Sequence, residues 1–365
     1  MAKKVETTYE RWMQSEGIPI VEGYAVEEVL AVSRGHWERM RAKGAFLHLR
    51  GMEGITGMYV LEIPPGGSVA PERHVYEELV YVLEGRGAAE VRVPDKPSAI
   101  FEWGAGSLFA IPLNVWHQLH NGSSAPALLL AVTNAPILFD ILRDESFIFG
   151  CDHVFADRYD GQPDYFKVGD RRYHGALDWP GWDTNFVADI RTVRIDLAAQ
   201  KGIGSRVAAL EMGGNVLNAH VAECPVGCYQ KAHYHGGGAV VLVVRGKGFT
   251  LMWPPEAGTR PYENGHGDLV MKVDWQEGSV LSPPTRWFHQ QFNLSPEPSL
   301  QVGLRYGSQK YGVGFHDVQR EGTLMPSKRR DRTIEYGDED PEIRRLYTEA
   351  LEQEGGSLEM PEAIG

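Results

Sequence analysis

Residues 231–246 read KAHYHGGGAVVLVVRG, and they place two histidines at the start of an apolar run that is typical of a β-strand. Alternate residues of a strand point to the same face of its sheet. The side chains of His233 and His235 are therefore expected on one face of the sheet, pointing into the interior that the sheet encloses. Three glycines follow the pair and keep the adjacent wall thin.

The arrangement around these histidines occurs twice in the chain. One copy is GSVAPERHVYEELVYVLEGRG (67–87) followed by GSLFAIPLNVWHQLHN (106–121), and the other is GCYQKAHYHGGGAVVLVVRGKG (227–248) followed by GSVLSPPTRWFHQQFN (278–293). His74 corresponds to His235, 161 residues later, and His117 corresponds to His289, 172 residues later. The second copy thus carries 11 additional residues, which lie within 252–268. The repeated order of strands, turns and histidines predicts two similar units.

The composition indicates an all-β protein with many turns. The 365 residues include 42 glycines and 22 prolines, spread among short β-like runs. The net charge of −13 argues against a partner that is nucleic acid or an anionic membrane. The N-terminus lacks the apolar core of a signal peptide, no run has the roughly 20 apolar residues of a membrane span, and only three cysteines are present. We therefore expect a cytoplasmic protein.

The two copies resemble the paired motifs of the cupin superfamily, G-x5-H-x-H-x3-E-x6-G and G-x5-P-x-G-x2-H-x3-N. The second copy matches them at Gly227, His233, His235, Gly246, Gly278, Pro284, His289 and Asn293, and the first copy at His74, Glu78, Gly85, Gly106, Pro112, His117 and Asn121. The resemblance implies a bicupin, that is, an all-β chain with two jelly-roll β-barrels and helical terminal arms.

The expected organisation has five parts. They are an N-terminal arm (1–54), a first cupin barrel (55–140), a connector (141–200), a second cupin barrel (201–310) and a C-terminal tail (311–365). The stretch 6–45 reads as mainly helix and loop. A further helix is expected over 340–354, because Asp340 can cap it, Pro341 suits its first turn and Gly355 follows its end. Such arms often pack on a partner subunit in bicupins, so we expect a homo-oligomer.

The three histidines of the second copy are candidate metal ligands. Three neutral imidazoles on one face suit a divalent metal ion with open coordination positions. Four positions after the second histidine of the pair, where the family motif has glutamate, this chain has Ala239. The predicted ligand set is therefore His233, His235 and His289, without a carboxylate.

The first copy departs from the motif differently. Glu72 stands at the first histidine position, and it shares strand parity with His74 and Glu78. Together with His117 these side chains form a second candidate metal site, with two histidines and one or two carboxylates. The alternative is a degenerate copy in which neighbouring arginines, such as Arg73 or Arg86, hold the carboxylates.

The histidine pattern H-x-H-x3-A resembles most closely that of the gentisate and 1-hydroxy-2-naphthoate dioxygenases. Oxalate decarboxylases instead have three histidines and one glutamate in both halves, a set that neither half has here. The resemblance implies Fe(II), with Mn, Zn or Ni as alternatives, and a small-molecule substrate held through two adjacent oxygens beside O2. The implied reaction cleaves a C–C bond of a hydroxylated aromatic acid or a similar chelating compound.

Six further residues are candidates for substrate binding or catalysis. An arginine can bind a substrate carboxylate through two parallel hydrogen bonds, and the other types can orient a substrate, line its pocket or move a proton. The candidates are Arg286, Gln291, Arg305, Trp287, His266 and Tyr229.

Two other functions remain open. The first is a non-oxidative metal-dependent lyase, hydrolase or isomerase, which the retained carboxylates of the first copy favour. The second is a cupin that binds metal without catalysing a reaction.

Overall fold

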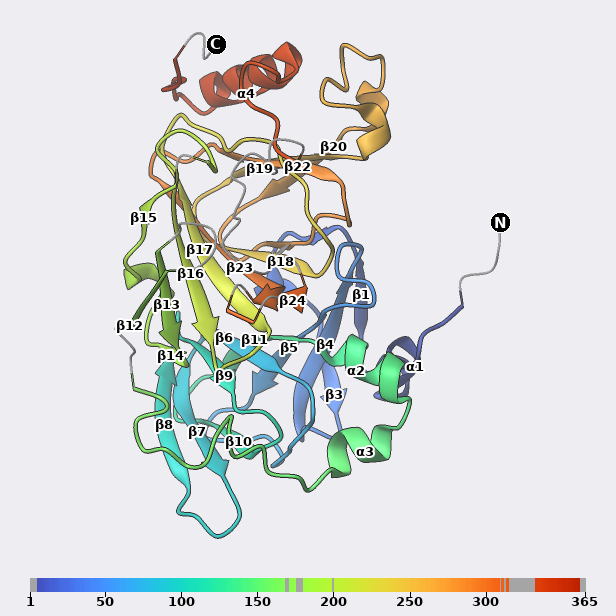
Figure 1. The fold of residues 1–365 in the computed structure, drawn as a ribbon, viewed down its shortest axis with the longest axis vertical. Helices are drawn as coiled ribbons and strands as arrows, with labels where there is room; N and C mark the ends of the chain where they lie inside the picture. Colours follow the sequence, from blue (N-terminus) through green and yellow to red (C-terminus); the bar gives the residue numbers. More distant parts are fainter. Residues whose placement is uncertain are drawn as a thin grey trace.

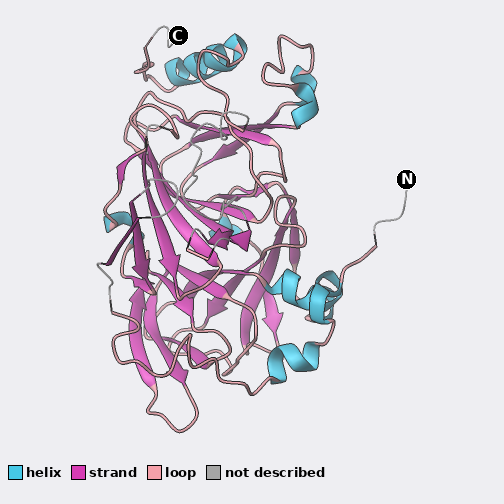
Figure 2. Ribbon diagram, viewed as in Figure 1, coloured by secondary structure: helices cyan, strands magenta, loops and turns pink. Residues whose placement is uncertain are grey.

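The computed structural model describes residues 5–167, 171–174, 180–198, 200–308, 310–311, 313–314 and 332–361. Two β-barrels lie one above the other along the long axis of the molecule (Figure 1), and strands make up most of both (Figure 2). Each barrel consists of one large sheet and one three-stranded sheet. The prediction of an all-β chain with two barrels and helices near its ends is confirmed.

The first barrel begins before the first copy of the motif. Its large sheet has the order β1 (Ile20–Gly23), β4 (Ala42–Leu49), β5 (Gly57–Ile63), β11 (Ala127–Thr133), β6 (Glu78–Glu84), β9 (Leu108–Ile111) and β14 (Phe186–Val187), with β3 (Gly35–Trp37) beside β4. Its small sheet has the order β10 (Trp116–Asn121), β7 (Arg86–Arg92) and β8 (Ala99–Gly104).

The second barrel repeats this arrangement. Its large sheet has the order β12 (Arg171–His174), β13 (Pro180–Thr184), β16 (Arg206–Met212), β17 (Leu217–Cys224), β23 (Ser299–Ser308), β18 (Ala239–Arg245), β21 (Val280–Leu281) and β2 (Ala25–Val26). β15 (Asp196–Leu197) pairs with β16, and β24 (Val313–Gly314) with β23. The small sheet has the order β20 (Met271–Trp275), β19 (Gly248–Trp253) and β22 (Phe288–Asn293).

The large sheets of the two barrels share a hydrophobic core. Val60 and Leu130 from the first barrel lie in one buried cluster with Val221 and Val302 from the second. The other faces of the same strands look into the barrels, so β11 and β23 are buried on both sides. This double burial explains why their sequences do not alternate apolar with polar residues.

The barrels also exchange strands. β2, which comes from the start of the chain, pairs antiparallel with β21 of the second barrel. β14, which follows the first barrel, pairs antiparallel with β9 of that barrel. Each exchanged strand is followed by a short 3-10 turn in which one backbone N–H donates to an acidic side chain, Glu28 in one case and Asp189 in the other.

Three helices pack beside the first barrel and one beside the second (Figure 1). They are α1 (Thr8–Ser15), α2 (Ala135–Leu142), α3 (Glu145–Gly150) and α4 (Pro341–Gln353). α1 starts with a reciprocal pair of side-chain caps between Thr7 and Glu10, and α4 starts with the Asp340 carboxylate accepting a hydrogen bond from the N–H of Glu342. The helix predicted over 340–354 is thus confirmed. Among the described helices, none combines the length and apolar character that crossing a bilayer requires.

The prediction of mainly helix and loop for 6–45 missed four strands. Only α1 is an α-helix there, and 20–49 contributes β1, β2, β3 and β4. The reason is long-range pairing: β1 pairs in parallel with β4, and β2 pairs with a strand of the other barrel. The predicted connector 141–200 likewise contains α3 and β12 to β15. The domain boundaries at 54, 140, 200 and 310 stay a prediction.

Candidate metal centres

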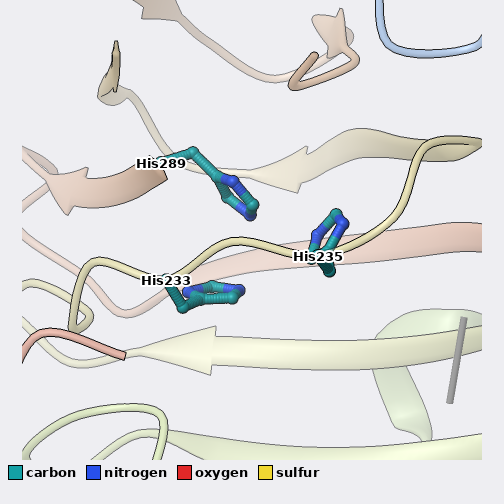
Figure 3. A group of neighbouring side chains, drawn as sticks. All are labelled: His233, His235 and His289. Carbon is teal, nitrogen blue, oxygen red and sulfur yellow. The ribbon is translucent and has the colours of Figure 1, made fainter. Parts of the chain in front are cut away.

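The three histidines of the second barrel come together in space. His233 and His235 lie in the segment that leads into β18, and His289 lies on β22. The N–H of His233 donates to the carbonyl of His289 over 3.1 Å, and the reverse bond is 2.9 Å long. The nitrogens that can bind a metal lie within 4.8 Å of one another. Figure 3 shows the three rings turned toward a common space, as the sequence predicts.

Hydrogen bonds orient each of these rings. In chain order, the Nδ1 atoms lie 3.2, 2.8 and 3.1 Å from the backbone carbonyls of Lys231, Gly236 and Trp287. A carbonyl only accepts, so each Nδ1 carries the proton and each Nε2 keeps its lone pair. Metal-binding histidines are held in this way by their second nitrogen. The donor chemistry therefore fits a divalent metal ion.

Burial and positive charge keep these imidazoles neutral. Burial lowers the pKa of His289 to about 4 and those of His233 and His235 well below the usual range. The charge of Lys201 lowers all three pKa values further, and that of Arg305 lowers the pKa of His235. Neutral rings bind a metal without first releasing a proton. Among the described residues, this group of ligands contains no carboxylate.

The C-terminal segment forms a wall beside the same histidines. Thr333 forms an antiparallel β-bridge with His233, and the N–H of Ile334 donates to the carbonyl of Ala232 over 2.8 Å. The segment that carries His233 therefore lies between β22 and the C-terminal segment. The sequence analysis did not anticipate this role for residues beyond 311.

A second group of ligand atoms lies in the first barrel. Glu72, His74 and His117 place theirs within 4.8 Å of one another. One carboxylate oxygen of Glu78 lies 3.1 Å from Nε2 of His74 and 3.9 Å from Nε2 of His117. Both rings again direct Nδ1 at a backbone carbonyl, at 2.9 and 3.0 Å. The structure thus brings together all four predicted side chains of this copy, a donor set that suits manganese or iron.

An arginine from before the first motif holds Glu72. Nη1 of Arg39 lies 2.5 Å from Glu72, and its Nε lies 3.1 Å from Glu16. Burial alone would raise the pKa of Glu72, but Arg39 and His117 hold it at about 2. Burial would likewise lower the pKa of His117, but Glu72 raises it. The carboxylate of Glu72 is thus ionised, and it lies between the guanidinium of Arg39 and the imidazole of His117.

Aromatic side chains close the first centre. Trp12 of α1 and Phe149 of α3 lie with their ring centres 5.4 and 4.6 Å from the guanidinium carbon of Arg39. The rings of Tyr76 and His74 are stacked, with centroids 3.7 Å apart. His74 is only 2% exposed, whereas His233 and His235 are partly exposed. The first centre is therefore more enclosed than the second.

The sequence analysis left open that neighbouring arginines hold the carboxylates of this copy. An arginine does hold Glu72, but it is Arg39 and not Arg73 or Arg86. Glu72 is paired with Arg39, as described, whereas Glu78 accepts a hydrogen bond from the hydroxyl of Tyr59. The guanidinium of Arg73 lies over the ring of Trp116, at 5.1 Å. Arg86 is exposed.

Three of the six substrate-site candidates lie near the second centre or on its elements. Arg305 is buried on β23, opposite Ala239. Gln291 is buried on β22, where its amide oxygen accepts a hydrogen bond from Thr250 over 2.5 Å. Trp287 is partly buried, its ring centroid lies 6.2 Å from that of Tyr24, and its carbonyl orients His289.

Of the other three candidates, Arg286 lies next to the second centre and two lie elsewhere. Arg286 is exposed in a turn with a φ of 63°, and its backbone N–H donates to the carbonyl of His235. His266 is exposed in the loop before β20. Tyr229 is fully buried beneath α4, where its ring stacks on Phe292 and its hydroxyl donates to Glu339. Tyr229 is bridged to Phe292, which lies on the face of β22 opposite to that of His289, so its side chain packs in the core away from the metal ligands.

Two residues that the sequence analysis missed shape these centres, Arg39 in the first and Lys201 in the second. Neither lies in a motif. Arg39 is 33 residues from Glu72 along the chain. The carbonyl of Lys201 accepts a hydrogen bond from the N–H of Lys231, which anchors it two residues from the histidine pair.

Comparison with known proteins supports this description of the fold. Residues 59–133 match the family model of the cupin domain. The crystal structure of the oxalate decarboxylase of Lactobacillus farciminis in complex with formate is similar, with 12% sequence identity, a TM-score of 0.50, and coverage of 78% of this chain and 86% of that chain. An oxalate decarboxylase structure concerned with an element that modulates proton-coupled electron transfer has the same identity and TM-score, with coverage of 78% and 77%. No curated protein is similar enough in sequence to count as a relative.

The chain therefore contains a cupin domain in its first half and has the bicupin fold as a whole. At this low identity the structural likeness shows the fold and not the activity. The comparisons do not support the finer resemblance to gentisate and 1-hydroxy-2-naphthoate dioxygenases, which stays a prediction. The two histidine groups are of a kind that can hold a metal ion.

Proposed function

We propose that this protein is a metal-dependent bicupin enzyme that performs non-oxidative chemistry, as a lyase, at the three-histidine centre of its second barrel. The observation that carries the proposal is the ligand set itself. Three Nε2 atoms converge, each made available by a hydrogen bond from its own Nδ1 to a carbonyl. His233, His235 and His289 would hold the metal.

The charge of this centre supports a Lewis-acid role. A divalent metal ion, when bound, polarises a carbonyl or carboxylate oxygen of the substrate. The three ligands are neutral, so the protein leaves the double positive charge of the ion uncompensated. Lys201 adds further positive potential, as its effect on all three pKa values shows. These residues together favour an anionic substrate and stabilise negative charge that develops on it.

The structural likeness also supports a lyase. Both similar structures are of decarboxylases, enzymes that break a C–C bond of a carboxylate. The ligand sets described here differ from the family motif at Ala239 in one barrel and Glu72 in the other. The substrate of this chain is therefore not taken to be oxalate.

A second candidate function is the predicted iron dioxygenase. Ala239 is the observation that favours it, because the absence of a fourth protein ligand provides room for a substrate and O2 together. In that case Fe(II) would be the metal, and the products would contain oxygen from O2.

The first barrel supplies a second metal site in this proposal. Glu72, His74, Glu78 and His117 would hold the ion. Because aromatic side chains and Arg39 enclose this centre, its role is to stabilise the fold of the first barrel. Turnover is assigned to the more accessible second centre.

The test uses metal-free protein reloaded with Mn(II), Fe(II), Zn(II) or Ni(II) and supplied with hydroxy, oxo and dicarboxylic acids. Carbon dioxide release and O2 uptake are measured in parallel, with and without air. Turnover without air that His289→Ala abolishes supports the lyase. His266→Ala, which changes an exposed histidine outside the cluster, is the matched control. Turnover that consumes O2 supports the dioxygenase, and turnover that His289→Ala leaves intact refutes the assignment to the second barrel.

A further inference from the structure

The two barrels differ in charge at one equivalent pair of positions. In the first barrel, Glu78 of β6 lies directly opposite Thr133 of β11. In the second barrel, the equivalent pair is Ala239 of β18 opposite Arg305 of β23. Residues directly opposite each other in an antiparallel pair extend to the same face of the sheet. At this equivalent pair, the first barrel therefore has a carboxylate and the second barrel has a guanidinium instead.

Arg305 lies on the inner face of the second barrel. Gln301 and Gly303 share its parity on β23, while Val302 and Leu304 face the core between the barrels. A side chain at Gly303 would collide with the ring of His220, which therefore lies over this inner face. Arg305 is only 5% exposed.

Arg305 lies beside the segment that carries the metal ligands. It stands directly opposite Ala239, which follows His235 by four residues. Lys201 is anchored nearby, because its backbone carbonyl accepts a hydrogen bond from the N–H of Lys231, two residues before His233. In the first barrel the corresponding ligand group is instead surrounded by Glu72 and Glu78.

We propose that Ala239 and Arg305 form an anion subsite, in which a carboxylate of the substrate occupies the place of the absent glutamate. This inference rests on the proposed function, since it needs a metal ion on the three histidines. The substrate carboxylate lies between that ion and the guanidinium of Arg305, which binds it through two parallel N–H···O bonds. Ala239 provides the room for this carboxylate, since its side chain is a single methyl group.

Substitutions of Arg305 and of Ala239 should therefore have different effects on anion binding. Without Arg305, the substrate carboxylate loses its charged partner but the three metal ligands remain. With glutamate at position 239, the protein itself supplies the carboxylate, as Glu78 does in the first barrel. Metal binding and anion binding can therefore be changed independently.

The experiment measures cobalt and anion binding to the full chain. Co(II) is loaded into metal-free protein, and its content and visible spectrum are recorded for wild type and His289→Ala. Malonate, acetate and the uncharged acetamide are then titrated, and dissociation constants are obtained by calorimetry. The variants are Arg305→Gln, Arg305→Lys and Ala239→Glu.

We expect malonate to change the cobalt spectrum, to bind more tightly than acetate, and to bind far more tightly than acetamide. Arg305→Gln weakens malonate binding roughly 10- to 100-fold, the usual cost of a lost charge-assisted pair, with unchanged cobalt content. Arg305→Lys keeps the charge without the fork, so its effect is intermediate. Ala239→Glu retains cobalt and abolishes malonate binding, which tests the subsite even if Arg305→Gln fails to fold.

Two results overturn the inference and are distinguishable. If cobalt binds at the three histidines but no anion changes its spectrum, or Arg305→Gln binds malonate as wild type does, the subsite is wrong and the metal centre stands. If His289→Ala binds as much cobalt as wild type, the proposed metal centre is wrong, and the subsite is refuted with it.

Discussion

A buried carboxyl group under the C-terminal helix should make the stability of the second barrel depend on pH. Glu339 is 7% exposed, and it accepts hydrogen bonds from the hydroxyl of Tyr229 and, over 2.6 Å, from the amide of Gln290. Burial raises its pKa from 4.5 to about 7, although these two bonds and the nearby Arg344 favour the charged form. The negative charge of the neighbouring Asp340 also raises the pKa of Glu339.

The sign and the size of the effect follow from this shift. Because the folded pKa lies above the unfolded one, the folded state binds the proton more tightly than the unfolded state does. The stabilisation is therefore complete below about pH 4.5 and is lost as the pH rises through about 7. At about 1.4 kcal/mol per pH unit, the free energy of unfolding should fall by roughly 3 kcal/mol over this range.

Denaturant unfolding from pH 4.5 to 8 measures this effect as the difference between wild type and Glu339→Gln. The variant cannot ionise, so it should become more stable relative to wild type as the pH rises. Glu352→Gln, at an exposed position of α4, is the matched control and should follow wild type. If Glu339→Gln and wild type show the same pH profile, the carboxyl is not protonated near neutral pH and the reasoning is wrong.

Three further predictions concern the two barrels. His289→Ala should reduce the metal content by one ion per chain, measured by elemental analysis, since the first-barrel ligands are untouched; retention of the full content would contradict the assignment. Arg39→Met should lower the free energy of unfolding by about 3–5 kcal/mol, because Glu72 is left buried without its cation, whereas Arg11→Met at an exposed site should have little effect. Gly303→Ala should cost about 1–3 kcal/mol, because the new Cβ would lie 2.0 Å from the His220 ring, and Gly104→Ala, with open space around it, should cost less than half as much. Thermal unfolding checks both substitutions, and equal Tm losses in a variant and its control would refute the explanation.

The repeat and the spacing of histidines were enough to predict both groups of candidate ligands. His233 and His235 are two residues apart on one segment, and His289 lies on the strand paired with it. Such positions depend on local periodicity and on a repeated motif, which a sequence displays directly. The same reasoning predicted α4, because its cap and its end carry local signals.

The residues that adjust the charge of these centres could not be found in this way. Arg39 and Lys201 reach the centres through tertiary packing, and no periodic pattern marks them. The strands of 20–49 were missed because β1 and β2 are only four and two residues long, and their partners decide their structure. A weak signal was present, since Glu28 and Asp189, 161 residues apart, cap equivalent turns.

Because β2 and β14 are exchanged, each half of this chain needs the other half to complete its large sheet. A gene fragment that encoded only residues 201–310 would produce a sheet whose β21 lacks its neighbour β2, and a fragment ending at 140 would leave β9 without β14. An unpaired strand edge invites aggregation. Neither half can therefore be removed without exposing a strand edge of the other, whatever ligands it carries. The exchange thus offers a reason why two centres of opposite charge persist in one polypeptide: each half is retained as a folding partner and is free to diverge as a catalyst.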